Sequence, residues 1–135
     1  PQALPRGVGG LTYEELTREV GDWHRFENRR QVSSYTGLCP RESSSGGSRR
    51  QGSASKHGNP RVRCLLVEMA WRLVRFQPHY RGFKKWEAVL LSPARKPSPA
   101  QKKKAIVAVA RILAVDLWRI FTGQMPAANV GLIMK

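Results

Sequence analysis

The sequence has few acidic residues and no long hydrophobic run. Its 135 residues include 9 Asp and Glu against 24 Lys and Arg, so the formal net charge is +15 at pH 7. No apolar stretch approaches the roughly 18 residues that a membrane-spanning helix requires, so we expect no such span here. The acidic residues lie at scattered positions that do not suit a cluster of carboxylates, and we therefore predict no metal site within this chain.

Cysteine is nearly absent as well. The two cysteines, Cys39 and Cys64, are far apart in sequence, and neither belongs to a pair with metal-binding spacing. We therefore expect the reduced thiols of a cytoplasmic protein rather than a disulfide.

The excess of positive charge indicates an anionic partner. A chain of this charge repels itself unless a polyanion lies nearby, so nucleic acid is the first candidate and an anionic membrane surface the second. Lys102, Lys103 and Lys104 fall at the start of the last predicted helix, where the helix dipole disfavours cations. That placement indicates either an anionic partner there or a simple exposed charge run.

No alternation of apolar and polar residues is long enough for a strand, and hydrophobic residues instead recur at helical spacing. We therefore predict an all-α fold, a small helical domain with two long amphipathic helices. These helices cover residues 60–77 and 99–122, and each begins with an N-cap residue, Asn59 or Ser98, followed by proline.

Two shorter helices are predicted nearer the N-terminus. The first runs from Leu11 to Val20, with Leu11 on its apolar face and with Thr12 and Glu15 spaced as a capping box. The second runs from Arg29 to Tyr35, after Asn28 as its N-cap.

A glycine-rich turn, residues 5–10, leads into the first of these helices. It resembles the second half of a helix-hairpin-helix, in which backbone N–H groups and the helix dipole hold a DNA phosphate. Gly7 and Gly9 are therefore candidate phosphate-binding residues. The alternative is a plain turn between packed helices.

A stretch without hydrophobic period, residues 39–60, interleaves serines, glycines and cations. Serine can hydrogen-bond or attack a phosphate, glycine lets the backbone approach closely, and arginine clamps phosphate oxygens with two donors. The alternative is a flexible, solvated loop. The candidate phosphate-binding residues of this stretch and of the helix start after it are Arg41, Gly46, Gly47, Arg49, Arg50, Lys56, Arg61 and Arg63.

Several short motifs follow one another in a distinctive order. They are Leu4-Pro5-Arg6-Gly7-Val8-Gly9, Ser34-Tyr35-Thr36-Gly37-Leu38-Cys39-Pro40-Arg41-Glu42, Ser45-Gly46-Gly47, Ser55-Lys56-His57-Gly58-Asn59 and Arg61-Val62-Arg63. With these motifs in this order, residues 4–77 closely resemble the C-terminal transposase domain of insertion-sequence transposases of the 110/116/902 type, and residues 78–122 look like the helical extension of one branch of that family.

The resemblance implies a role for Ser45, which matches the serine of the family pattern Pro-Arg-x-x-x-Ser-Gly-Gly. That serine is the nucleophile of DNA strand cleavage and transfer. Attack on a phosphodiester would leave a phosphoserine and a free sugar hydroxyl, and religation would need no external energy source. Serine needs activation for this step, and neighbouring cations could neutralise the phosphorane.

The resemblance also implies a domain plan and a set of partners. Residues 1–123 would form the transposase domain, with residues 124–135 as a flexible tail. Mg²⁺ would be held by an RNase-H-like (RuvC-type) domain that this sequence lacks, and no cofactor is expected in the chain itself. The implied partners are DNA at the element ends and target, a structured guide RNA, and further copies of a full-length protein in the bacterial cytoplasm, associated with the nucleoid.

Two other functions remain open from the residues alone. The chain could be a non-catalytic basic helical module that holds DNA or RNA, including a ribosome-associated protein. It could also be an inactive, truncated transposase remnant, because Cys64 stands where the family usually has an arginine.

Overall fold

The fold is all-α, as the sequence predicts. A computed structural model describes residues 4–38, 58–91 and 96–135. Within these ranges the only β-type pairing is an isolated bridge between Pro5 and Met134. The helices are α1 (Gly10–Val20), α2 (Arg29–Thr36), α4 (Pro60–Phe76), α5 (Glu87–Leu90) and α6 (Pro99–Phe121), with 3₁₀ turns η1 (Trp23–Arg25), η2 (Arg81–Trp86) and η3 (Ala127–Val130).

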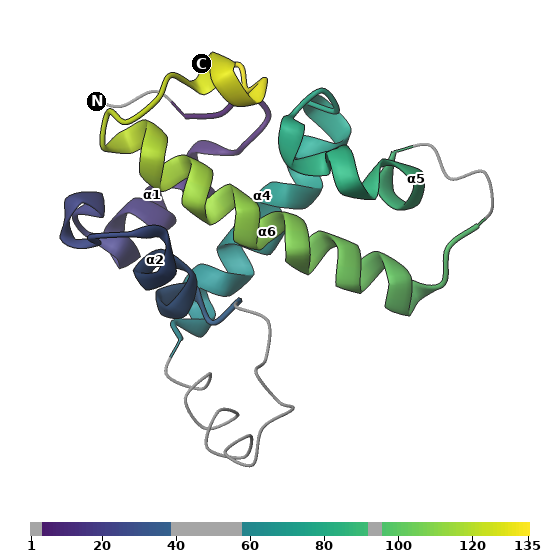
Figure 1. Ribbon diagram of the computed structural model, residues 1–135, viewed down its shortest axis with the longest axis horizontal. Coiled ribbons are helices and arrows are strands. Elements are labelled where there is room, and N and C mark those ends of the chain that lie inside the picture. Colours follow the sequence, from purple (N-terminus) through teal and green to yellow (C-terminus); the bar gives the residue numbers. More distant parts are fainter. Residues whose placement is uncertain (1–3, 39–57, 92–95) are drawn as a thin grey trace, which may run out of the picture.

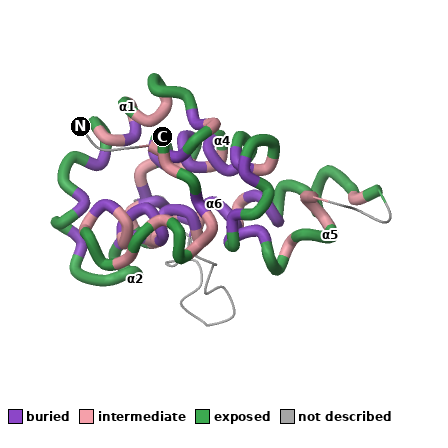
Figure 2. The backbone as a smooth tube through the Cα atoms, turned by 90° about the horizontal axis from the view of Figure 1, so that it is seen from above, coloured by how far each residue is buried: buried purple, intermediate pink, exposed green. Residues whose placement is uncertain are grey.

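The longest helix, α6, is the centre of the core. It packs against α4 and α2 and also against η2 and α5, so it lies between α2 on one side and η2 with α5 on the other (Figure 1). Figure 2 shows buried positions along both α4 and α6, whereas α5 is mostly exposed or half-buried. The predicted apolar face of α4 is confirmed from Val62 to Leu73, but Phe76 at its end is 45% exposed.

Both long helices begin where the sequence predicts. Asn59 caps α4, and its side-chain oxygen accepts hydrogen bonds from the backbone N–H groups of Arg61 (3.0 Å) and Val62 (3.1 Å). Ser98 and Gln101 form a reciprocal capping box at the start of α6. These caps satisfy N–H groups that a helix start otherwise leaves without partners.

The predicted capping box at Thr12 and Glu15 is wrong. α1 begins at Gly10 and its N-cap, Gly9, makes no side-chain cap. Thr12 therefore lies inside the helix, where its hydroxyl donates to Glu68 on α4 (3.1 Å). Leu11 does not join the core either and is 74% exposed, because a residue five positions before the buried Leu16 lies on a different side of the helix.

The C-terminal residues also differ from the expected flexible tail. Leu132 is 4% exposed, and Lys135 N–H donates to the Leu4 carbonyl (2.7 Å). The buried Gln77 amide donates to the carbonyls of Arg6 (2.8 Å) and Ile133 (2.9 Å) and accepts from Ile133 N–H (2.7 Å). This one side chain joins both ends of the described chain, a pairing that no local sequence pattern reports.

Candidate nucleic-acid interface

The described residues on either side of the segment predicted to meet phosphate lie next to each other. The described chain stops at Leu38 after α2 and resumes at Gly58 before α4. Asn59 N–H donates to the Tyr35 carbonyl (2.6 Å). A Cβ on Gly58 would lie 2.4 Å from the Gly37 Cα, so only glycine allows the two ends to approach this closely. We call this junction the loop base.

Three helices meet at the loop base through side chains. Asn59 Nδ2 donates to Glu19 Oε1 of α1 (3.1 Å) and to the Tyr35 hydroxyl of α2 (3.0 Å). The Tyr35 hydroxyl in turn donates to the Glu19 carbonyl (2.9 Å). Sequence reasoning assigned Asn59 only a capping role, and no local signal links it to residues 24 and 40 positions away.

The outgoing side of the loop base is held by Thr36. Its hydroxyl donates to the Ser33 carbonyl (2.8 Å) and accepts from Leu38 N–H (3.2 Å). Leu38 itself is buried in the core. The last described residue before the loop is therefore anchored by both packing and hydrogen bonds.

The two predicted phosphate-binding cations at the start of α4 contact the protein. The Arg61 guanidinium forms an ion pair with Glu15 of α1. Arg63 donates to the Thr36 carbonyl (3.5 Å), at the C-terminal end of α2 where the helix dipole favours a cation. Both therefore stabilise the loop base. The remaining predicted residues lie outside the described ranges, namely Ser45, Arg41, Gly46, Gly47, Arg49, Arg50 and Lys56.

The glycine turn forms a separate feature. Gly7 has a φ of 95°, its carbonyl accepts from Arg72 Nε (2.9 Å), and a Cβ there would lie 2.5 Å from Phe76. Residues 4–6 run beside the C-terminal residues. At 1.5 Å per residue, Arg72 lies about 17 Å along α4 from Arg61. The structure thus places the predicted phosphate-binding Gly7 near one end of α4, and Arg61 and Arg63 near the other.

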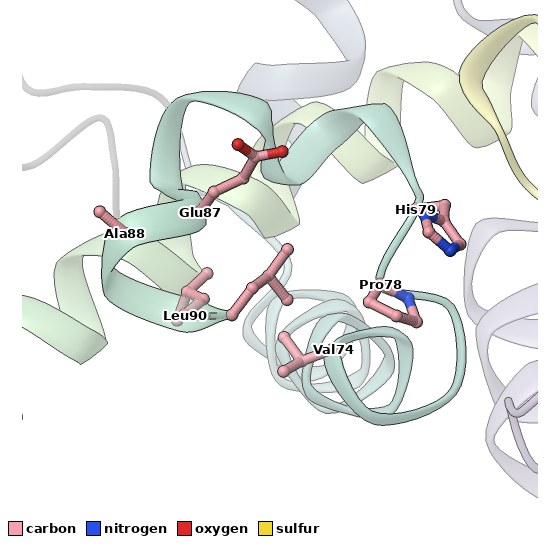
Figure 3. A pocket seen from close by; sticks show the side chains of 7 residues that line it. Val74, Pro78, His79, Glu87, Ala88 and Leu90 are labelled. Atoms are coloured by element: carbon pink, nitrogen blue, oxygen red, sulfur yellow. The ribbon is translucent and has the colours of Figure 1, made fainter. Parts of the chain in front are cut away.

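A groove with apolar walls lies near the end of α4. It has a volume of about 710 Å³ and is lined by residues of α4, α5 and the segment between them. Figure 3 shows Glu87 and His79 on separate elements around it, with Val74, Ala88 and Leu90 as apolar lining. Its composition suits an apolar side chain rather than a phosphate.

A sequence profile of the IS116/IS110/IS902 transposase family matches residues 5–85. The chain belongs to this family. It is 40% identical over 114 residues to a putative transposase, y4rJ, of Sinorhizobium fredii, covering 84% of this chain and 28% of that protein. It is 35% identical over 124 residues to the transposase for insertion sequence element IS1111A of Coxiella burnetii, covering 91% and 32%.

The chain spans about a third of the length of these curated relatives. No solved structure matches it. Both the loop base and the glycine turn of this transposase-family chain fall inside the residues that the family profile matches.

The carboxylates of the described ranges do not gather into a metal site, since no group of three or more His, Cys, Asp or Glu side chains lies close enough together. Asp116 is instead buried, and its Oδ2 accepts from the Tyr80 hydroxyl (2.6 Å). Burial raises the pKa of Asp116, and burial together with the Asp116 charge raises the pKa of Tyr80 well above its ordinary value. The pair therefore joins Tyr80, the residue before η2, to α6.

The helices of residues 4–38, 58–91 and 96–135 include no candidate membrane span. None of them combines the length and the hydropathy that crossing a bilayer requires.

Proposed function

We propose that this chain is the part of a DNA transposase that presents residues 39–57 to a DNA phosphodiester, with Ser45 as the nucleophile. The observation that supports this most is the loop base, which lies within the family match. There Asn59 and Gly58 close the segment against Tyr35 and Gly37. A closed base limits where the segment can reach, and reduced freedom of this kind is what positioning a nucleophile requires.

The proposed step balances as a transesterification. The Ser45 hydroxyl oxygen bonds to phosphorus, and the phosphorus–oxygen bond to one sugar breaks. The serine proton passes to a base, and the departing sugar oxygen takes up a proton to become a hydroxyl. The phosphoserine ester keeps the phosphate activated, so attack by another sugar hydroxyl reverses the chemistry and releases the serine.

Cations close to Ser45 in sequence would stabilise the charge that develops on phosphorus. We assign this role to Arg41, Arg49, Arg50 and Lys56, and the close backbone approach to Gly46 and Gly47. Arg61 and Arg63 act differently, because Glu15 and the Thr36 carbonyl already engage them. They would keep the loop base in place while DNA binds.

Mg²⁺ does not fit the carboxylates that the structure describes, since they form no cluster and Asp116 is buried against Tyr80. The described carboxylates therefore hold no metal ion for the proposed step. The RuvC-like domain that the family resemblance implies remains the place where Mg²⁺ is expected.

A second function is supported by the glycine turn. The first turn of α1 has no side-chain cap, and the exposed Phe76 ring lies under the guanidinium groups of Arg72 (4.8 Å) and Arg75 (5.5 Å). Open N–H groups beside arginines suit a phosphate, so Gly7 and Gly9 could hold DNA or RNA without any catalysis.

A covalent-capture assay separates these functions. The chain, supplemented with a RuvC-like domain and Mg²⁺, is mixed with insertion-element end DNA and run on a denaturing gel. We expect a protein–DNA adduct that disappears in Ser45→Ala and remains in the matched controls Ser43→Ala and Ser44→Ala. An adduct that survives in Ser45→Ala refutes the assignment of the nucleophile. Salt-sensitive binding without any adduct favours the non-catalytic module or an inactive remnant.

Binding by the chain alone is a simpler measurement. If about six cations each bind a phosphate, affinity for duplex DNA should fall roughly a thousandfold between 50 and 200 mM salt. Salt-independent binding would argue against every nucleic-acid function considered.

The remaining partners and the location belong to the same proposal. A structured guide RNA should raise the adduct yield on its matching DNA. Light scattering of the full-length protein should show more than one copy. We place this activity in the bacterial cytoplasm, associated with the nucleoid, which microscopy of a tagged full-length protein would check.

A further inference from the structure

A cationic hollow lies beside the loop base. It has a volume of about 560 Å³ and is formed by residues of η1 and α2 together with Phe26, which follows η1. Its lining residues are Arg25, Phe26, Arg30, Gln31, Ser34 and Tyr35. We call it the Arg25 hollow. It combines two guanidinium groups, a hydroxyl and an amide with two aromatic rings, and no carboxylate lines it.

Two rings hold the Arg25 guanidinium in place. Its central carbon lies 4.7 Å from the centroid of the Phe26 ring and 4.6 Å from that of Tyr35. The two rings are themselves 5.2 Å apart. A guanidinium packed on ring faces keeps its N–H donors in the plane of the group, so they stay available at the edge for an anion.

Neither guanidinium group of the hollow forms an ion pair in the described ranges, although the Glu27 carboxylate lies close by and accepts from the Gln31 amide (3.5 Å). In the described ranges the ion pairs involve Arg18, His24 and Arg61, and neither Arg25 nor Arg30 takes part in one. Arg25 and Arg30 are both exposed. An arginine with a purely structural role normally donates to a carboxylate or a carbonyl, as Arg61 and Arg63 do here.

The hollow and the loop base share a residue. Tyr35 contributes its ring to the hollow, while its hydroxyl and carbonyl both bond Asn59 at the loop base. Ser34 lies four residues before the last described residue ahead of the loop, Leu38. An anion in the hollow would therefore lie beside the loop base.

We propose that the Arg25 hollow, which lies beside the loop base, binds a backbone phosphate of the DNA strand. Arg25 presents its paired donors to the phosphate oxygens, Arg30 adds a second cation, and the Ser34 hydroxyl donates a hydrogen bond. This inference rests on the proposed function, which supplies the DNA. Its effect is to fix the register of the strand relative to the loop, as phosphate contacts generally do.

The test measures how DNA affinity depends on salt. The 135-residue chain and its variants are titrated into a fluorescein-labelled 30-base-pair duplex at several KCl concentrations. The variants are Arg25→Ala, Arg30→Ala and Arg25→Lys. Arg29→Ala is the matched control, because Arg29 is exposed on the same helical turn but does not line the hollow.

We expect Arg25→Ala and Arg30→Ala to weaken binding about three- to tenfold at 100 mM KCl and each to reduce the salt slope by about 0.9, the value expected for one phosphate. Arg29→Ala should change both quantities less. Arg25→Lys should keep the slope but lose affinity, since an ammonium cannot present two parallel donors. Arg30→Ala keeps the test valid if Arg25→Ala unfolds, because Arg30 is exposed and outside the ring stack.

Two results would overturn the inference. If Arg25→Ala and Arg30→Ala behave like Arg29→Ala while the wild type binds DNA with a steep salt slope, the hollow is not a phosphate site and the proposed function is unaffected. If the wild type itself does not bind DNA, both the hollow and the proposed function fail.

Discussion

The two halves of this chain use charge in different ways. Residues 1–78 carry 13 Lys and Arg and 7 Asp and Glu, whereas residues 79–135 carry 11 and 2. In the first half, Glu15 pairs with Arg61, and Glu19 accepts from Asn59. In the second half, Asp116 is buried against Tyr80. The first half thus uses polar contacts to hold helices around the loop base.

The second half leaves its lysines exposed to solvent. Lys84 and Lys85 of η2 and the lysines at the start of α6, residues 102–104, are all exposed. No ion pair involves any of them in the ranges that the structure covers. Net charge alone therefore does not locate a binding surface. In this chain, charge near the loop base is partly structural, and charge on α6 is free to meet a polyanion.

The largest effect is expected where the loop base is tightest. In Gly58→Ala the new Cβ would lie 2.4 Å from the Gly37 Cα, so the backbone at Gly58 must move away from the backbone at Gly37. We expect a loss of about 3 kcal/mol in the free energy of unfolding, the upper end for over-packed positions. Gly10→Ala is the control, because nothing lies within 4 Å of its Cβ, and it should be neutral or slightly stabilising. Equal urea midpoints for the two variants would show that the loop base is not closed.

The second-largest effect is expected at the buried Tyr80–Asp116 hydrogen bond of residues 79–135. Tyr80→Phe leaves the Asp116 carboxylate without its hydroxyl donor, which should cost about 1–3 kcal/mol at pH 7 in urea unfolding. The hydrogen bond from Tyr80 lowers the Asp116 pKa, so its removal raises that pKa further and the cost should shrink in acid. A cost that is the same at pH 4 and pH 7 would contradict this account.

Asp116→Asn tests the same pair by its pH dependence. Burial raises the folded-state pKa of Asp116 above its ordinary value of 3.8. The folded protein therefore binds the proton more tightly than the unfolded chain does, and this contribution to stability is complete below pH 3.8 and lost as the pH rises through the raised pKa. Asp116→Asn should remove that decline, measured as the difference in unfolding free energy from the wild type between pH 4 and pH 7.

A pair of helix caps compares the two halves directly. Asn59→Ala and Ser98→Ala each remove an N-cap, which costs about 1 kcal/mol in thermal or urea unfolding, and Asn59→Ala should cost more than Ser98→Ala because it loses further contacts. Only Asn59→Ala also breaks the hydrogen bonds to Glu19 and Tyr35. We therefore expect Asn59→Ala alone to lower the adduct yield in covalent capture. Equal yields would mean that the loop base does not position residues 39–57.

The smallest effect is expected at the start of α6. Replacing Lys102, Lys103 and Lys104 by Gln removes cations that the helix dipole disfavours, so stability should rise by about 0.5 kcal/mol. If these lysines meet DNA, the salt slope should also fall, by about 0.9 for each phosphate that the variant no longer binds. An unchanged slope would identify them as a solvated charge run.

Local patterns in the sequence predicted much of the helical framework. Asn59 and Ser98 are caps in the structure, as short side-chain acceptors before proline indicate, and α4 buries the predicted face. One local prediction was nevertheless wrong. Thr12 and Glu15 have capping-box spacing, but helix α1 starts at Gly10, and contacts with α4 decide where both side chains point.

The sequence by itself determined the helical class, the two long helices and the family motifs, because periodicity, caps and motif order are properties of neighbouring residues. Only the tertiary structure decided the rest. Gln77 joins residues 56 and 71 positions away, Tyr35 and Asn59 close the loop base, and Arg25 lies over two rings. Each of these contacts depends on how separate helices pack, and no local pattern in the chain encodes that packing.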